Sequence, residues 1–144
     1  MTLRAVVSAL PLGAGRITVV DQTPNLEGRD HPSLMALSID VIKAPGVAFF
    51  SGFAELVRQD AMAKGLDAYF WMHSDAALGD GVARAGLASL CIMYHSNVPW
   101  GALMFSFDVF CVFSVKAVTA TGPWDPGLVQ VCQPLTHTHT HICI

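Results

Sequence analysis

Three small or polar residues, His73, Ser74 and Asp75, directly follow an apolar run over residues 68–72. A short apolar run that is rich in aromatic residues predicts a strand buried on both faces, and ligand crevices in α/β proteins open at the carboxyl ends of such strands. A carboxylate at that place is a hard oxygen ligand that can hold a divalent cation and, through it, a phosphate. Asp75 is therefore a candidate metal ligand. The alternative is that Asp75 is the N-cap of a helix that begins with residues 76–78, since Asp is favoured there.

A second acidic residue, Asp21, stands in the same position relative to another strand. The β-branched run over residues 17–20 predicts a buried strand that ends at Asp21, and loop-forming residues follow over 22–33. Because the carboxyl ends of parallel strands meet at one edge of a sheet, we expect Asp21 and Asp75 to emerge side by side from adjacent strands. The alternative for Asp21 is a turn-forming role, in which its side chain bonds to nearby backbone.

The elements that must position these residues follow from the spacing of apolar side chains. Over residues 51–64, apolar side chains recur at helical spacing with charged residues between them, which predicts an amphipathic helix that stops at Gly65. The other predicted elements are helices at 3–10, 76–88 and 116–121 and strands at 17–20, 39–42, 68–72, 90–94, 102–107 and 110–115. This order is typical of an α/β sandwich with a mostly parallel, mixed central sheet.

Composition excludes some classes of function. The formal net charge is −3 and the Lys and Arg residues are scattered, so the sequence has no electrostatic footprint for nucleic acid. The longest apolar tract, residues 101–114, contains Asp108 and is followed by Lys116, so we expect no transmembrane segment. A hydrophobic share of 53% against 13% charged residues predicts either extensive burial or exposed apolar surface. The four cysteines form no CxxC pair and predict no zinc site.

Three blocks of the sequence, in order, resemble the family 2 nucleotide-sugar glycosyltransferases. ITVVDQTPN is similar to the family's second-strand motif IIVVDNGS, and GFAELVRQDAMAKGLDAYFWMHSD is similar to the helix and strand that lead into its DxD motif. VFCVFSVKAVTATGPWDPGL resembles the later block in which a strand and a short helix run into GGFDE. The resemblance covers most of residues 3–128. It implies a GT-A fold that binds a nucleotide-diphosphate sugar through Mn²⁺ or Mg²⁺ and transfers the sugar to a hydroxyl acceptor.

The resemblance also implies roles for residues at the predicted edge of the sheet. Asp21 matches the family's Asp that contacts the base or ribose of the nucleotide, and Thr23 lies beside it in the same motif. Asp75 matches the last Asp of DxD, which binds the metal. His73 stands where the first carboxylate of DxD would be, and an imidazole can ligate Mn²⁺ or hydrogen-bond a ribose hydroxyl. The alternative for His73 is a hydrogen-bonded structural role at a strand end.

A sugar site is implied near the end of the third block. Trp124 and Asp125 fall at the place of the family's Phe-Asp, which holds the acceptor or the donor sugar, and an indole face can stack on a sugar ring. The alternative for Trp124 is that it closes the core beside a Pro-rich turn. His95 and Asn97, which follow the predicted strand at 90–94, would line the same cleft.

Two parts of the family pattern have no counterpart in this sequence. An inverting transferase needs a general base, which in the family usually lies beyond the GGFDE block, and no Asp or Glu follows Asp125. The family's first strand should precede the helix at 3–10. We therefore expect residues 1–128 to be a partial GT-A domain, truncated at both ends, with an incomplete sheet, an unpaired edge and marginal stability. The alternative function is a catalytically inactive fragment or pseudoenzyme of that fold.

The remaining segment, residues 129–144, is a Thr/His tract. His137, His139 and His141 alternate, and alternate residues of an extended strand share one face, so three imidazoles can converge on Zn²⁺, Cu²⁺ or Ni²⁺. A metal-binding protein is thus a function hypothesis of a different class. The alternative is a low-complexity tail, because such a tract needs no packed structure.

Overall fold

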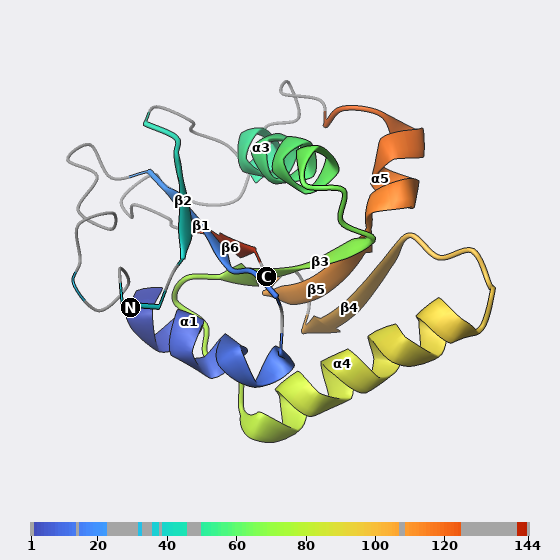
Figure 1. Cartoon of the computed structure of the whole chain (residues 1–144), viewed down its shortest axis with the longest axis horizontal. Coiled ribbons are helices and arrows are strands. Elements are labelled where there is room, and N and C mark those ends of the chain that lie inside the picture. The colour runs from blue at the N-terminus through green and yellow to red at the C-terminus, as the bar shows by residue number, and fades with distance from the viewer. Residues whose placement is uncertain are drawn as a thin grey trace.

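The computed structural model of this chain describes residues 2–13, 15–22, 32, 36–37, 39–45, 50–106, 109–124 and 141–143. Within them, helices cover both faces of a mixed sheet in three layers (Figure 1). Helices α1 (Thr2–Ala9) and α4 (Asp80–His95) lie on one face, and α3 (Phe50–Ala63) and α5 (Val115–Thr121) lie on the other (Figure 1). The predicted α/β class is confirmed.

The order of the strands determines which chain ends meet at each edge of the sheet. The order is β2 (Asp40–Lys43), β1 (Thr18–Asp21), β6 (His141–Cys143), β3 (Ala68–His73), β5 (Phe110–Ser114) and β4 (Ala102–Ser106). Among these described strands, only β1 and β2 pair in parallel. The prediction of a mostly parallel sheet is therefore wrong for the pairing, because β6 and β5 run against their neighbours. Since β6 is antiparallel to both β1 and β3, those two strands run in the same direction.

Strand β3 contributes to two separate cores, as the apolar run predicts. Successive side chains of a strand point to opposite faces of the sheet. Phe70 and Met72 therefore pack with α1 and α4, whereas Tyr69 and Trp71 pack with α3 and α5. All four side chains are buried, which confirms the prediction of a strand covered on both faces.

Helix α3 has the amphipathic pattern and the end that the sequence predicts. Its inward residues Phe53, Val57 and Ala61 are buried against the sheet. After the helix, Gly65 has a φ of 63°, its N–H donates to the Met62 carbonyl at 3.1 Å, and the N–H of Leu66 donates to the Ala61 carbonyl at 3.1 Å. A left-handed residue with this pair of hydrogen bonds is a common helix end, and glycine adopts it without steric cost.

Helix α4 corrects two predictions. It begins at Asp80, not at residue 76, and residues 90–94, predicted as a strand, form its last part. An apolar run of this length does not distinguish a buried strand from a helix segment, and here it is not buried: Ile92 is 68% exposed and Tyr94 is 59% exposed. Gly86 lets the helix approach the sheet closely, since a Cβ on Gly86 would lie 3.1 Å from the Phe110 ring.

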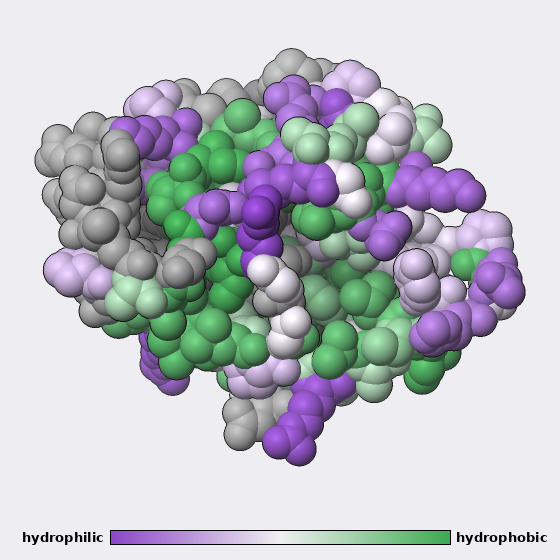
Figure 2. Space-filling view, viewed as in Figure 1, coloured by the Kyte–Doolittle hydropathy of each residue, from purple (hydrophilic) through white to green (hydrophobic). Residues whose placement is uncertain are grey.

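Part of the high hydrophobic content of the sequence lies on the surface. Large apolar side chains remain exposed on α1, on α4 and on the outer strand β4, as well as filling the two cores. Figure 2 shows apolar patches interspersed with polar ones on the face seen in Figure 1, including a patch over α1. Among the described residues, no helix is both long enough and apolar enough to cross a membrane.

Candidate functional site

The carboxyl ends of β1 and β3 lie at the same edge of the sheet. Val20 of β1 and His73 of β3 are both paired with His141 of β6, so the two strands end level with each other. Because neighbouring strands are about 4.8 Å apart, β1 and β3 are separated by about 10 Å. The expectation that they are adjacent is wrong, since β6 lies between them. The expectation that Asp21 and Asp75 belong to one edge agrees with this register.

Asp21 is the last residue of β1, and its side chain is inside the protein. It is 1% exposed, and its carbonyl accepts a hydrogen bond of 2.9 Å from the Ala44 N–H. Thr18 and Val20 face α3, so strand alternation directs the Asp21 side chain to the opposite face, with Val19. A carboxylate in this position supports the edge from within and offers little surface to a ligand.

His73 is the last residue of β3, and Asp75 lies on the turn that follows the strand. The His73 N–H donates to the Val109 carbonyl at 3.1 Å, and its own carbonyl accepts from the Ala76 N–H at 3.2 Å. Asp75 is exposed to solvent on this turn. It is not the N-cap of α4, because Gly79 holds that position.

The segment between the turn and α4 is fixed by α1. The Leu78 N–H donates to Ser8 Oγ at 2.9 Å, and Ser8 Oγ donates to the Ala5 carbonyl at 2.7 Å. This bond holds residues 76–79 outside the helix, which is why the helix begins later than the sequence predicts. The turn with Asp75 is therefore held against the α1 side of the molecule.

The donor atoms described at this edge suit a cation that brings ligands of its own. No group of three or more His, Cys, Asp or Glu side chains within the described ranges can hold a metal ion. A resident metal centre of oxygen ligands is thus not present in that part of the chain. Mg²⁺, however, is usually bound by one or two carboxylates together with substrate phosphates and water. An exposed carboxylate such as Asp75 fits an ion that arrives with a diphosphate.

Of the other residues predicted for the site, the structure describes three, and it places these away from this edge. Thr23 and Asp125 lie outside the described residues. His95 ends α4 and Asn97 follows it, so both lie at the far end of that 16-residue helix, about 24 Å from its start. Their assignment to the cleft came from the incorrect strand at 90–94.

Trp124 packs at the opposite end of β3. Its ring is edge-on to the Phe113 ring, with the ring centroids 6.2 Å apart. Phe113 is paired with Tyr69, which lies four residues before His73 on β3. Its backbone N–H donates to Glu55 Oε2 on α3 at 3.0 Å. These contacts correspond to the alternative in which Trp124 closes the core beside a turn.

Glu55 is the centre of a hydrogen-bonded cluster that the sequence did not reveal. Arg58 donates from Nε and Nη2 to its two oxygens at 2.8 and 2.7 Å, and Gln59 donates at 2.7 Å. These bonds, that of Arg58 above all, together with the Trp124 N–H, outweigh burial and lower the pKa of Glu55 to about 2. The cluster joins the segment after α5 to α3.

Glu55 should make the stability of the protein depend on pH. Its folded pKa of about 2 lies below the usual value of 4.5, so its contribution is complete above pH 4.5 and is lost as the pH falls through 2. Allowing for partial solvent screening, we expect Glu55→Gln to cost about 1–2 kcal/mol at neutral pH and almost nothing near pH 2. Urea unfolding of both proteins across this range measures the difference. A deficit that is the same at both ends of the range would contradict the assignment.

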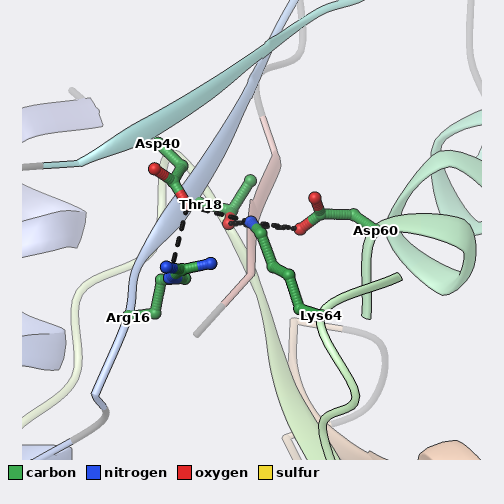
Figure 3. Close-up of polar contacts among 5 residues, drawn as sticks. All are labelled: Arg16, Thr18, Asp40, Asp60 and Lys64. Atoms are coloured by element: carbon green, nitrogen blue, oxygen red, sulfur yellow. Dashed lines mark hydrogen bonds and ion pairs between the residues drawn. The ribbon is translucent and has the colours of Figure 1, made fainter. Parts of the chain in front are cut away.

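A second cluster joins α3 to the amino ends of β1 and β2 (Figure 3). Lys64 Nζ donates to Asp60 at 2.7 Å, to Asp40 at 2.9 Å and to Thr18 Oγ1 at 3.2 Å, and Arg16 lies 3.6 Å from Asp40. The hydrogen bond from Lys64 lowers the pKa of Asp40. Burial lowers the pKa of Lys64, but its bonds to the two carboxylates outweigh burial and raise it. With three acceptors, the Lys64 ammonium group links α3 to the first residues of β1 and β2.

Comparisons with known proteins assign this chain to no family. No protein-family model, curated protein or solved structure matches the chain. The interpretation of the site therefore rests on the residues described above.

Proposed function

We propose that this chain binds a nucleotide-diphosphate sugar at the carboxyl edge of β1 and β3, in the manner of the glycosyltransferases that three of its sequence blocks resemble. The observation that carries the proposal is the register through β6, which makes Val20 and His73 level. It leaves Asp21, at the end of β1, and Asp75, two residues after β3, at one edge. A crevice at the carboxyl ends of strands that run together is the usual ligand site of α/β proteins.

The folding of the three resembling blocks supports a GT-A-like assignment. The first block forms β1, which ends at Asp21. The second block forms α3 and then β3, and β3 ends at His73. The third forms β5, α5 and the turn at Gly122. The described part of each block thus forms the type of element expected from the family motif. We propose the GT-A class on this basis, for a sheet whose neighbouring strands are largely antiparallel.

Within this proposal, Asp75 is the residue that meets the ligand. Its exposed carboxylate would hold a Mn²⁺ or Mg²⁺ ion that bridges the diphosphate, since such an ion takes most of its oxygen ligands from phosphate and water. His73, two residues earlier at the strand end, would hydrogen-bond the ribose or a phosphate oxygen. Asp21 would support the edge from inside. Trp124 has no part in the site, because it packs at the other end of β3.

Binding is proposed ahead of sugar transfer. Transfer to a hydroxyl acceptor needs a general base in addition to the groups that bind the donor, and the proposal assigns no residue to that role. The alternative of a catalytically inactive member of the fold is therefore the closest competitor to an active transferase. Hydrolysis or transfer of the donor sugar above background, with Mn²⁺ present, would favour the active enzyme.

Calorimetry with UDP and GDP, with and without Mn²⁺, tests the binding proposal. We expect saturable binding that needs the cation, and Asp75→Asn should weaken it at least about tenfold, or about 1.4 kcal/mol. Asp67→Asn is the matched control, because Asp67 is also an exposed aspartate but precedes β3 at the opposite edge. Absence of nucleotide binding with Mn²⁺ present, or an equal loss in both variants, would overturn the proposal.

A further inference from the structure

Among the described strands, the outer strand β4 is paired on one side only, with β5. The Ser114 N–H donates to the carbonyl of the opposite residue, Gly101, and the next pair along the ladder is Phe113 with Ala102. Hydrogen-bonded and non-hydrogen-bonded pairs alternate in an antiparallel ladder, so the N–H and C=O groups of Ala102 and Met104 point away from β5. Both residues are exposed. The edge therefore offers donors and acceptors to a further strand.

The two outer strands of the described sheet differ in charge. Strand β2 carries Asp40 and Lys43, and Asp40 forms an ion pair with Lys64. Strand β4 has the sequence ALMFS, without a charged residue or a proline, and its pairing with β5 is regular until a bulge after Met104. Proteins commonly protect sheet edges against further pairing with charged side chains or proline. Of these two edges, that of β4 is the one open to another strand.

Helix α4 presents an apolar surface next to this edge. Gly86 is buried against Phe110 of β5, but none of residues 87–95 is buried, although most of them are apolar. Leu90 and Met93, which continue the face of Gly86 at helical spacing, are only half-buried. Figure 1 shows this half of α4 reaching past β4, the last strand of the sheet. A strand added beside β4 would lie against this half of the helix and cover these side chains.

A second copy of this chain supplies a strand that fits the edge. Two identical edges that pair in antiparallel fashion are related by a twofold axis, so each donor of one copy meets an acceptor of the other. With Leu103 opposite Leu103 of the second copy, Ala102 of each copy stands opposite Met104 of the other. Each of these pairs then exchanges both of its backbone hydrogen bonds.

The exposed surface beside the edge is large enough for a reversible pair. Leu87, Val98 and Met104 are 37%, 56% and 57% exposed. Together with the half-buried side chains around them and the strand itself, they expose on the order of 500 Å² per copy, so a symmetric pair would bury about 1,000 Å². Since this is about the smallest total area of a specific interface, we expect a dissociation constant in the micromolar range.

We propose that this chain forms a symmetric dimer through β4, in which the sheet of one copy continues into that of the other and the second half of α4 covers the junction. A membrane surface would also take up the apolar side chains. It would leave the outward N–H and C=O groups of Ala102 and Met104 without hydrogen-bond partners, which is costly away from water. A strand of the same type satisfies both the apolar side chains and the backbone groups.

Sedimentation equilibrium of the full chain at micromolar concentrations tests the proposal. We expect a monomer–dimer equilibrium that Ala102→Pro weakens at least about tenfold, because proline removes an N–H that points away from β5. The melting temperature of the dilute monomer should stay close to that of the parent chain, since no bond to β5 is lost. Met104→Lys should weaken the dimer by a similar factor. Met62→Lys, at an exposed methionine of α3, is the matched control and should dimerise as the parent does.

A mixture of two charged variants tests the register. The two copies of Met104 are diagonal neighbours across the junction, at a spacing of about 7–8 Å that long side chains can span. Met104→Lys and Met104→Glu should each be largely monomeric alone, and their equimolar mixture should form the dimer again. Mixing does not repair a weakened fold, so this rescue separates a lost interface from a lost structure.

Four results would overturn the proposal. The first is a parent chain that stays monomeric at about 100 µM, whether or not it sediments with phosphatidylcholine vesicles, which would assign the surface to a membrane. The second is association that continues to larger species. The third is unchanged dimerisation in both Ala102→Pro and Met104→Lys, and the fourth is a mixture of the two charged variants that remains monomeric.

The variants also separate this inference from the proposed function. Asp75→Asn should lose nucleotide binding and dimerise as the parent chain does. Met104→Lys should lose the dimer and bind nucleotide as the parent chain does. Either proposal can therefore fail while the other stands.

Discussion

Phe110→Ala is expected to lower the free energy of unfolding by about 3–5 kcal/mol, which is the usual cost of removing a buried aromatic ring. Phe110 is 1% exposed, its ring stacks on Phe70 with centroids 5.5 Å apart, and it meets Phe105 at 5.1 Å. Phe70 lies on β3 and Phe105 on β4, and α4 covers the ring at Gly86, so these elements limit how far the cavity can close. Since the free energy of unfolding of a domain is only about 5–15 kcal/mol, a large fraction of the variant molecules should be unfolded in mild urea. Equilibrium unfolding followed by circular dichroism measures this.

The close approach of Gly86 to Phe110 provides an internal control. A Cβ at residue 86 would lie 3.1 and 3.3 Å from two Phe110 ring atoms, so Gly86→Ala alone should crowd the ring. In a Phe110→Leu background those atoms are gone, and the same alanine should stabilise the helix by up to about 1 kcal/mol. Additive effects of the two changes would contradict the packing described here.

Tyr94→Ala, at an exposed position of α4, should cost less than about 0.5 kcal/mol.

Ile142→Pro is expected to cost about 3 kcal/mol, the second largest effect, because it removes a backbone N–H from the centre of the sheet. Ile142 is paired with Val19 on one side and with Met72 on the other. Proline is found in sheets almost only on edge strands, where no ladder bond is lost. The free energy of unfolding and the hydrogen-exchange protection of the Met72 amide should therefore fall together.

Ile142→Val is the matched control for the proline variant. It keeps the backbone N–H and a β-branched side chain, so both measurements should stay close to those of the parent chain. If the proline and valine variants were equally stable, residues 141–143 would not be a central strand. The shared edge of β1 and β3 would then lose the register on which the proposed function depends.

Much of the fold could be predicted from local sequence. The strands that end at Asp21 and His73, the helix that stops at Gly65 and the pair β5–α5 were all predicted to within a few residues. Their apolar periodicity and their end signals reside in neighbouring residues, so no distant contact is needed to recognise them. The edge that carries Asp21 and Asp75 followed from those strand ends.

What failed depended on contacts between distant parts of the chain. Residues 90–94 were predicted as a strand because a short apolar run is compatible with a strand and with a helix. The structure shows that they end α4, a helix that packs against Phe110 through Gly86. Trp124 was expected at a sugar site, but Glu55 and Phe113 hold it elsewhere.

The sequence by itself determined the strands, the helices and the acidic residues at two strand ends, because these depend on spacing along the chain. Only the tertiary structure decided that β6 separates β1 from β3, that Asp21 is buried while Asp75 is exposed, and that His73 is paired with His141. The reason is physical: strand order and register are set by which hydrogen-bonding edges meet after the chain folds back on itself. Residues far apart in sequence become neighbours only then.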